Sequence, residues 1–78
     1  MEPRPVPINT DQIKLDSFLK WANVVTTGGQ AKSLLLAGVV SVNGELEQRR
    51  GRKLRVGDIV VVQGVGAFRV IRSGDRQG

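Results

Sequence analysis

The spacing of apolar residues changes once along this chain, near Gly38, and that change limits the folds it can adopt. Before Gly38, apolar residues recur three or four positions apart, which is typical of helices that bury one face. After Gly38, short apolar runs are separated by glycine-containing turns, as in antiparallel strands. The pattern therefore predicts an α+β fold, with a helical hairpin packed on a small antiparallel β-sheet.

The helical part is predicted to contain two short helices. The first spans residues 13–23 and presents Leu15, Phe18 and Leu19 on one face. The second begins after Thr27, because Thr27 and Gln30 fit the capping pattern Ser/Thr-x-x-Glu/Gln. Gly38 stands where a left-handed residue is expected to end this helix.

The strand part is predicted from its turns. Asn43-Gly44 favours a type I′ hairpin, since both of its central residues need positive φ. Either Val40 and Val42 or Val39 and Leu46 could face the core, and the pattern leaves both faces open. The remaining strands lie between further glycine turns at 57–58 and 64–66. The expected strands are 39–42, 45–48, 59–62 and 68–71.

The chain has 78 residues, which is enough for one small domain. All three prolines fall within the first seven residues, so this segment is extended and at best an edge strand. We expect a loose N-terminal segment over residues 1–7, a single domain over 8–72 and a loose tail over 73–78.

The stretch "TTGGQAKS" looks like a phosphate loop of the Walker type. That motif needs glycine at the positions of Thr26 and Ala31, and Lys32 falls inside the helical pattern, about one turn past the start of the helix. A nucleotide site is therefore not expected. The helix start could still bind an anion such as an RNA phosphate, because its amides are unpaired. Alternatively, Gly28 and Gly29 only permit a tight turn between the helices.

The charge pattern favours a polyanionic partner. The chain carries 12 Lys and Arg against 7 Asp and Glu, a net charge of +5. The segment "QRRGRKLR" contains five cations and no acid, and we expect it to form a loop at one edge of the sheet: Arg49, Arg50, Arg52, Lys53 and Arg55. A solvated surface loop is the simpler interpretation. Nucleic-acid contact is favoured because such dense like charges repel one another unless an anion binds.

The sequence gives little support for other functions. Histidine and cysteine are absent, and no metal-ligand spacing occurs, so we expect no enzyme, catalytic residue, metal or other cofactor. No apolar run approaches the ~20 residues that cross a bilayer, and a small domain without cysteine suits a reducing compartment, so we expect a cytoplasmic protein with no membrane partner. Without catalytic residues or a nucleotide site, we also expect no small-molecule substrate. Trp21 either flanks the core or stacks on a base, and the first interpretation is favoured.

The order of these elements resembles the S-four RNA-binding domain, also called the alpha-L motif, from about residue 14 to residue 62. The resemblance is strongest with the small, free-standing bacterial members, the YbcJ-like proteins. It depends on the following short stretches: Lys14-Leu15-Asp16, Gly28, Gln30-Ala31-Lys32, Leu34-Leu35, Gly38, Val42-Asn43-Gly44, Glu47-Gln48-Arg49-Arg50 and Gly57-Asp58.

The resemblance implies a non-catalytic protein that binds structured RNA, such as ribosomal RNA or a ribosomal particle, through a positively charged surface. By position, Lys14, Thr27 and Lys32 match residues of that surface, whereas Gly28 replaces a common arginine. We expect a monomer whose RNA-binding residues are Lys14, Thr27, Gly28, Gly29, Gln30, Lys32, Arg49, Arg50, Arg52 and Lys53. The alternative function is a protein-interaction module that docks on an acidic protein partner.

Overall fold

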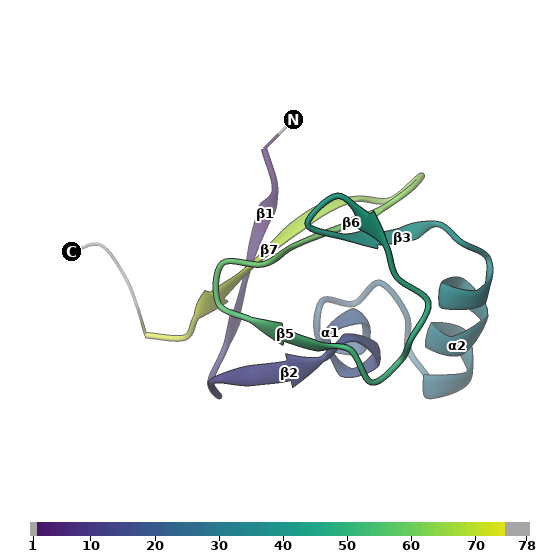
Figure 1. The fold of residues 1–78 in the computed structure, drawn as a ribbon. Helices are drawn as coiled ribbons and strands as arrows, with labels where there is room; N and C mark the ends of the chain where they lie inside the picture. Colours follow the sequence, from purple (N-terminus) through teal and green to yellow (C-terminus); the bar gives the residue numbers. More distant parts are fainter. Residues whose placement is uncertain (1, 75–78) are drawn as a thin grey trace.

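A computed structural model describes residues 2–74, which form two helices and seven strands in two layers (Figure 1). In chain order the elements are β1 (Arg4–Ile8), β2 (Gln12–Lys14), α1 (Leu15–Trp21), α2 (Gly28–Leu36), β3 (Val40–Val42), β4 (Glu45–Leu46), β5 (Lys53–Arg55), β6 (Ile59–Val62) and β7 (Gly66–Arg72). One layer is a five-stranded sheet, and the other contains the helices and a two-stranded sheet.

The five-stranded sheet has the order β1-β7-β6-β3-β4. Neighbouring strands from β7 to β4 pair antiparallel, as expected, but β1 pairs parallel with β7. The α+β fold is thus confirmed, and the sheet is mixed instead of wholly antiparallel. Parallel pairing is possible here because a long crossover, which includes the helical layer, separates β1 from β7 in the chain.

Strand β1 includes residues that the sequence assigned to a loose segment over 1–7. Pro5 and Pro7 lack amide hydrogens, but in an edge strand every second amide points away from the sheet. The alternating prolines therefore leave Val6 and Ile8 to pair with β7 and face the core. Of the tail expected over 73–78, residues 75–78 lie outside the described residues.

The two-stranded sheet β2–β5 was not predicted. Residues 13 and 14 were assigned to the first helix, but they lie in β2, and α1 begins only at Leu15. The expected basic loop is likewise shorter, because Lys53–Arg55 forms β5. The end of the first helix agrees better with the prediction, since Asn23 adopts φ 63 in the turn towards α2.

The core lies between the two layers. Val40 and Val42 point inward and are at most 1% exposed, whereas Leu46 is 61% exposed, so the first of the two open alternatives is correct. The turn that sets this register is the predicted one, with φ 52 at Asn43 and φ 88 at Gly44. The helices contribute the other half of the core through buried residues, which are Leu15, Phe18, Leu19, Ala31 and Leu35.

Candidate nucleic-acid interface

The two-stranded sheet brings together cations from distant parts of the sequence. Lys14 of β2 lies opposite Lys53 of β5, and Gln12 lies opposite Arg55. The residues between them face the core, where Leu54 is fully buried. Lys14, Lys53 and Arg55 therefore share the outer side of this sheet, and all three are exposed. Two lysines directly opposite each other repel, so this side favours an anion.

The basic loop, residues 49–52, connects to this sheet and covers the start of α1. The Leu15 amide donates to the Arg52 carbonyl at 2.8 Å, and the Asp16 amide donates to the Arg50 carbonyl at 3.2 Å. First-turn amides have no acceptor within their own helix, and the side chain of Lys14 makes no capping bond. The carbonyls of the basic loop thus take the place of an N-cap side chain.

Glu47 holds the basic loop from inside. Its side chain is 8% exposed, and its carboxylate accepts bonds from Arg49 Nε at 3.1 Å and Arg52 Nη1 at 2.9 Å. It also accepts from the backbone amide of Arg49 at 3.0 Å. The bonds from Arg49 are the main cause that lowers the pKa of Glu47 from 4.5 to about 2. Glu47 is therefore ionised at neutral pH and joins two of the five cations to the fold.

The sequence predicts these five cations as one group, but in the structure they form two groups. The side chains of Arg49 and Arg52 are bound to Glu47, whereas those of Arg50, Lys53 and Arg55 form no ion pair within residues 2–74. The backbone amide of Arg55 donates to Asp58 Oδ2 at 2.9 Å, a bond in which its guanidinium takes no part. We define the basic face as four exposed residues: Lys14, Arg50, Lys53 and Arg55. Arg55 was missing from the predicted site, although its alternation with Lys53 could have indicated it.

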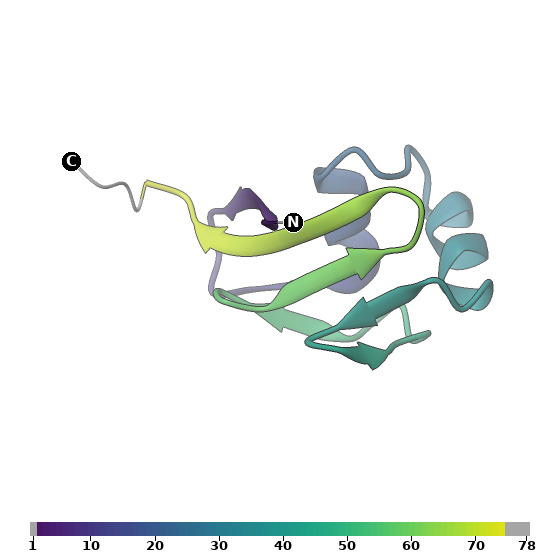
Figure 2. The same ribbon diagram turned by 90° about the horizontal axis from the view of Figure 1, so that it is seen from above.

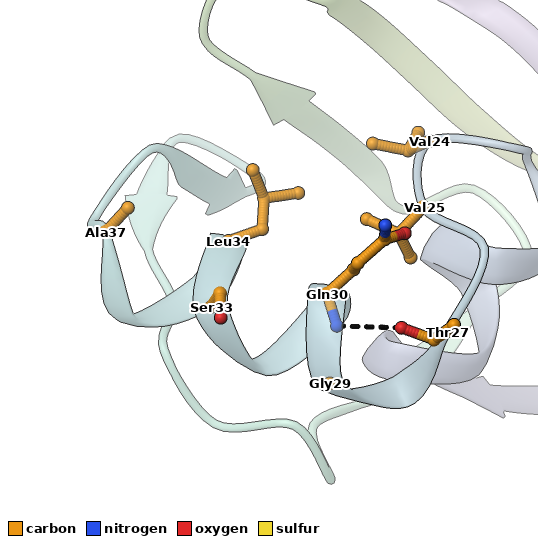
Figure 3. A pocket seen from close by; sticks show the side chains of 8 residues that line it. All are labelled: Val24, Val25, Thr27, Gly29, Gln30, Ser33, Leu34 and Ala37. Carbon is orange, nitrogen blue, oxygen red and sulfur yellow. Dashed lines mark hydrogen bonds between the residues drawn. The ribbon is translucent and has the colours of Figure 1, made fainter.

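The start of α2 has the predicted cap. The amide of Gln30 donates to Thr27 Oγ1 at 3.1 Å (Figure 3). The reciprocal bond of a capping box does not go to Thr27, because Gln30 Oε1 accepts from the amide and the hydroxyl of Thr26 at 2.7 and 2.8 Å. Both threonines therefore fix the entry into α2.

Nothing in the described fold requires Gly28 or Gly29 to be glycine. A Cβ at Gly28 would meet no atom within 4 Å, and one at Gly29 would meet only Thr27 Oγ1 at 3.9 Å. Neither residue has positive φ, and the left-handed residue in the turn between the helices is Asn23. The alternative that these glycines serve only a tight turn therefore has no support from their conformation.

Only some of the residues predicted at the start of α2 line the same groove. Thr27, Gly29 and Gln30 line a shallow groove of about 630 Å³, together with Val24, Val25, Ser33, Leu34 and Ala37 (Figure 3). Lys32 is not among the residues that line this groove, and it lies about one turn after Gly28. Gln48 Nε2 donates to the Leu36 carbonyl at 3.4 Å, which joins the end of α2 to the segment leading to the basic loop.

Trp21 lies apart from these groups. Its indole Nε1 donates to the Pro7 carbonyl at 2.6 Å and so joins the end of α1 to strand β1. The side chain remains 57% exposed, which agrees with a residue that flanks the core. This bond gives Trp21 a structural role that does not depend on a base.

Within residues 2–74, no group of three or more acidic, histidine or cysteine side chains is arranged to hold a metal ion. None of the helices in this part of the chain has the length and apolar character needed to cross a membrane.

The sequence is similar to that of known proteins of one family. The chain is 49% identical over 67 residues to the probable ribosome maturation protein RlbA of Bacillus subtilis (strain 168). The aligned region covers 86% of this chain and 94% of that protein. The family model described as S4 domain matches residues 6–71. That match includes both helices, the two-stranded sheet and the basic loop, and the chain therefore belongs to the S4 domain family.

Proposed function

We propose that this protein is a non-catalytic RNA-binding protein that acts on structured ribosomal RNA or a ribosomal particle in the bacterial cytoplasm. Membership of the S4 domain family and the ribosome-maturation name of its relative support a ribosome-related role. The observation that carries the proposal is the basic face, where Lys14 and Lys53 oppose each other without an acidic side-chain partner in residues 2–74. Phosphate groups would relieve that repulsion.

The residues of the site have different tasks in this proposal. Lys14, Arg50 and Lys53 contact phosphates, and Arg55 joins them from the same side of β5. Arg49 and Arg52 hold the loop through Glu47, and Arg49 also points a mostly exposed side chain, 77%, towards solvent. Recognition is mainly of backbone and shape, as is usual for double-stranded RNA.

The start of α2 is the second part of the proposed contact. Thr27 and Gln30 hold the helix end in place, and Lys32 provides a further cation. Gly28 and Gly29 let an RNA backbone approach the helix amides without obstruction by a side chain. We propose that the protein does this as a monomer, without a cofactor or a small-molecule substrate.

The test is a salt series of RNA binding, measured by fluorescence anisotropy with a folded ribosomal RNA fragment. The wild type is compared with Arg50→Ala/Lys53→Ala/Arg55→Ala. Each phosphate contact contributes roughly 0.7 to 0.9 to the log–log slope, so the triple variant should flatten the slope by about two to three units. Arg49 and Arg52 are left unchanged, because their loss would also disturb Glu47.

The matched control removes three exposed cations elsewhere, in Arg4→Ala/Lys20→Ala/Arg69→Ala. It lowers the net charge equally and should keep most of the slope. Equal slopes in the two triple variants would show that net charge, and not the basic face, drives binding. If the wild type binds no RNA at low salt but binds an acidic protein through the basic face, the acidic-partner alternative replaces this proposal.

A further inference from the structure

The five-stranded sheet has an apolar side that no described element covers. Side chains alternate along each strand, and the inward set forms the core. The outward set consists of apolar residues apart from Ser41 and Arg69; besides two prolines of β1, it includes Leu46, Ile59, Val61, Ala67 and Ile71. We name this set the outer sheet face. Figure 2 shows the strands in front, with the helices of residues 2–74 behind or beside them.

The register makes this face continuous. Leu46 lies opposite Ser41, Ser41 opposite Val61, and Val61 opposite Ala67, in one row across four strands. Leu46 is 61% exposed and Val61 is 37% exposed. At the end of the row, the β6–β7 turn encloses a groove of about 490 Å³ that Val65 helps to line. Single exposed apolar residues are normal, but contiguous apolar patches mark interaction sites.

Arg69 gives this face its charge. It lies opposite Ile59 on one neighbouring strand and opposite Pro5 on the other, so its strand neighbours are apolar. It has no ion-pair partner within residues 2–74, and no outward position of the five strands holds an acid. A partner that covers this face must supply a carboxylate, because a buried unpaired charge is costly.

We propose that the outer sheet face docks a protein segment in which apolar side chains flank a carboxylate that pairs with Arg69. The apolar row and the adjoining groove would take the aliphatic or aromatic side chains, and the aspartate or glutamate would reach Arg69. This interaction is additional to RNA binding and does not depend on it.

Charge and edge structure disfavour a second copy, a nucleic acid or an added strand as the partner of this face. A second copy packed face to face would bring two Arg69 side chains and no carboxylate into the interface, and each copy carries a net charge of +5. Nucleic acid is a poor match, since its phosphates gain little from an apolar surface with one cation. An added strand is also disfavoured, because prolines line the β1 edge and β4 has two residues.

The two surfaces lie on different layers of the molecule. The basic face belongs to the layer that contains β2, β5 and the helices, and the outer sheet face is the far side of the other layer (Figure 1). RNA on one side therefore leaves the other side accessible. With both surfaces occupied, the protein would join a folded RNA to a protein partner.

The experiment selects binders from a library of random displayed peptides on the full chain. Selected peptides are synthesised and titrated into wild type and into Val61→Thr, Arg69→Glu and Arg50→Ala/Lys53→Ala/Arg55→Ala. We expect peptides with an acid between apolar residues. Their affinity should fall at least about tenfold with Arg69→Glu and should stay unchanged in the basic-face variant. Val61→Thr keeps a β-branched residue in β6 and should also weaken them.

A charge swap separates docking from a general effect on folding. Peptides in which lysine replaces the acid should bind poorly to the wild type and regain affinity for Arg69→Glu. Amide NMR shifts should move at Val61 and Ala67, and native-like spectra of the variants confirm that they fold.

Three results would overturn the proposal. The first is a selection without acidic, apolar peptides, and the second is a set of peptides that bind Val61→Thr and Arg69→Glu as tightly as the wild type. The third is a dimer in sedimentation equilibrium that Val61→Thr dissociates, because it would show that a second copy covers this face. RNA binding by Val61→Thr should equal that of the wild type, so failure here leaves the proposed function standing.

Discussion

Two short antiparallel pairs in this molecule, β3–β4 and β2–β5, are held together in different ways. The strands of β3–β4 are joined by Asn43-Gly44, and both turn residues adopt the positive φ that a type I′ turn requires. The strands of β2–β5 are separated by both helices and the first hairpin. No turn of their own brings them together.

The second pair depends on a polar anchor. Glu47 binds Arg49 and Arg52, and the basic loop then offers its carbonyls to the first amides of α1. In this arrangement Lys53–Arg55 lies beside Gln12–Lys14. A local hairpin is thus encoded by two adjacent residues, whereas the sheet that carries the basic face is encoded by contacts between distant ones. The two helix starts show the same contrast, since α2 is capped by its neighbour Thr27 and α1 by a remote loop.

The largest effect is expected from breaking the local pair. Asn43→Val/Gly44→Val places β-branched residues where φ is positive. The strained backbone should lower the free energy of unfolding by about 1–2 kcal/mol per residue. It also removes the Asn43 bonds to Asp58 Oδ1 and to the Ile59 amide, at 3.1 and 2.9 Å. We expect loss of the native fold near room temperature. A dispersed, native-like NMR spectrum would contradict this prediction.

The second largest effect on stability is expected from Glu47→Gln, which weakens the non-local pair β2–β5. Loss of the charged hydrogen bonds to Arg49 and Arg52 should lower the free energy of unfolding by about 1–3 kcal/mol, measured by urea denaturation. Hydrogen exchange should increase more in β5 than in β3. The matched control is Glu45→Gln on the exposed strand β4, which should change stability by no more than about 0.5 kcal/mol. Equal effects of the two substitutions would show that Glu47 does not anchor the loop.

Acid should remove the same anchor in the wild type. The bonds from Arg49 lower the pKa of Glu47 to about 2 in the fold, against 4.5 ordinarily. The folded pKa is the lower one, so this stabilisation is complete above about pH 4.5 and is lost as the pH falls towards about 2. The difference in urea midpoint between wild type and Glu47→Gln should therefore shrink over that range. A difference that stays constant would rule out this linkage.

The capped start of α2 should show a smaller effect. Thr27→Ala removes the acceptor of the Gln30 amide and should destabilise the protein by about 1 kcal/mol, as typical N-caps do. Thermal unfolding measures this loss. Thr27→Ser keeps the oxygen and should behave nearly like the wild type. An unchanged melt for Thr27→Ala would mean that Thr26 and Gln30 fix the helix start by themselves.

The smallest effect on stability is expected on the basic face. Arg50→Ala and Lys53→Ala remove exposed side chains without an acidic partner in residues 2–74, so each should change the free energy of unfolding by no more than about 0.5 kcal/mol. Lys53→Ala could even stabilise the β2–β5 pair slightly, because it ends the repulsion with Lys14. Urea denaturation at low salt is the measurement. A loss above 1 kcal/mol would show that these cations support the fold.

Features that depend on neighbouring residues could be predicted from the order of the amino acids. The two helices, the Thr27 cap, the Asn43-Gly44 turn and the strands β3, β4, β6 and β7 were predicted because spacing and turn chemistry are local properties, whereas β5 was not. The basic character of the segment before Gly57 was equally plain from its composition.

Features that depend on contacts between distant residues are set by the folded chain. Burial chose Val40 and Val42 over Val39 and Leu46, since only one side of β3 can meet the helices. Pairing with β7 ordered the proline-containing segment. Above all, Glu47 divided the cations into those that hold the loop and those that face solvent. A residue pattern cannot show this division, because the strength of an ion pair depends on distance and burial that only the folded chain supplies.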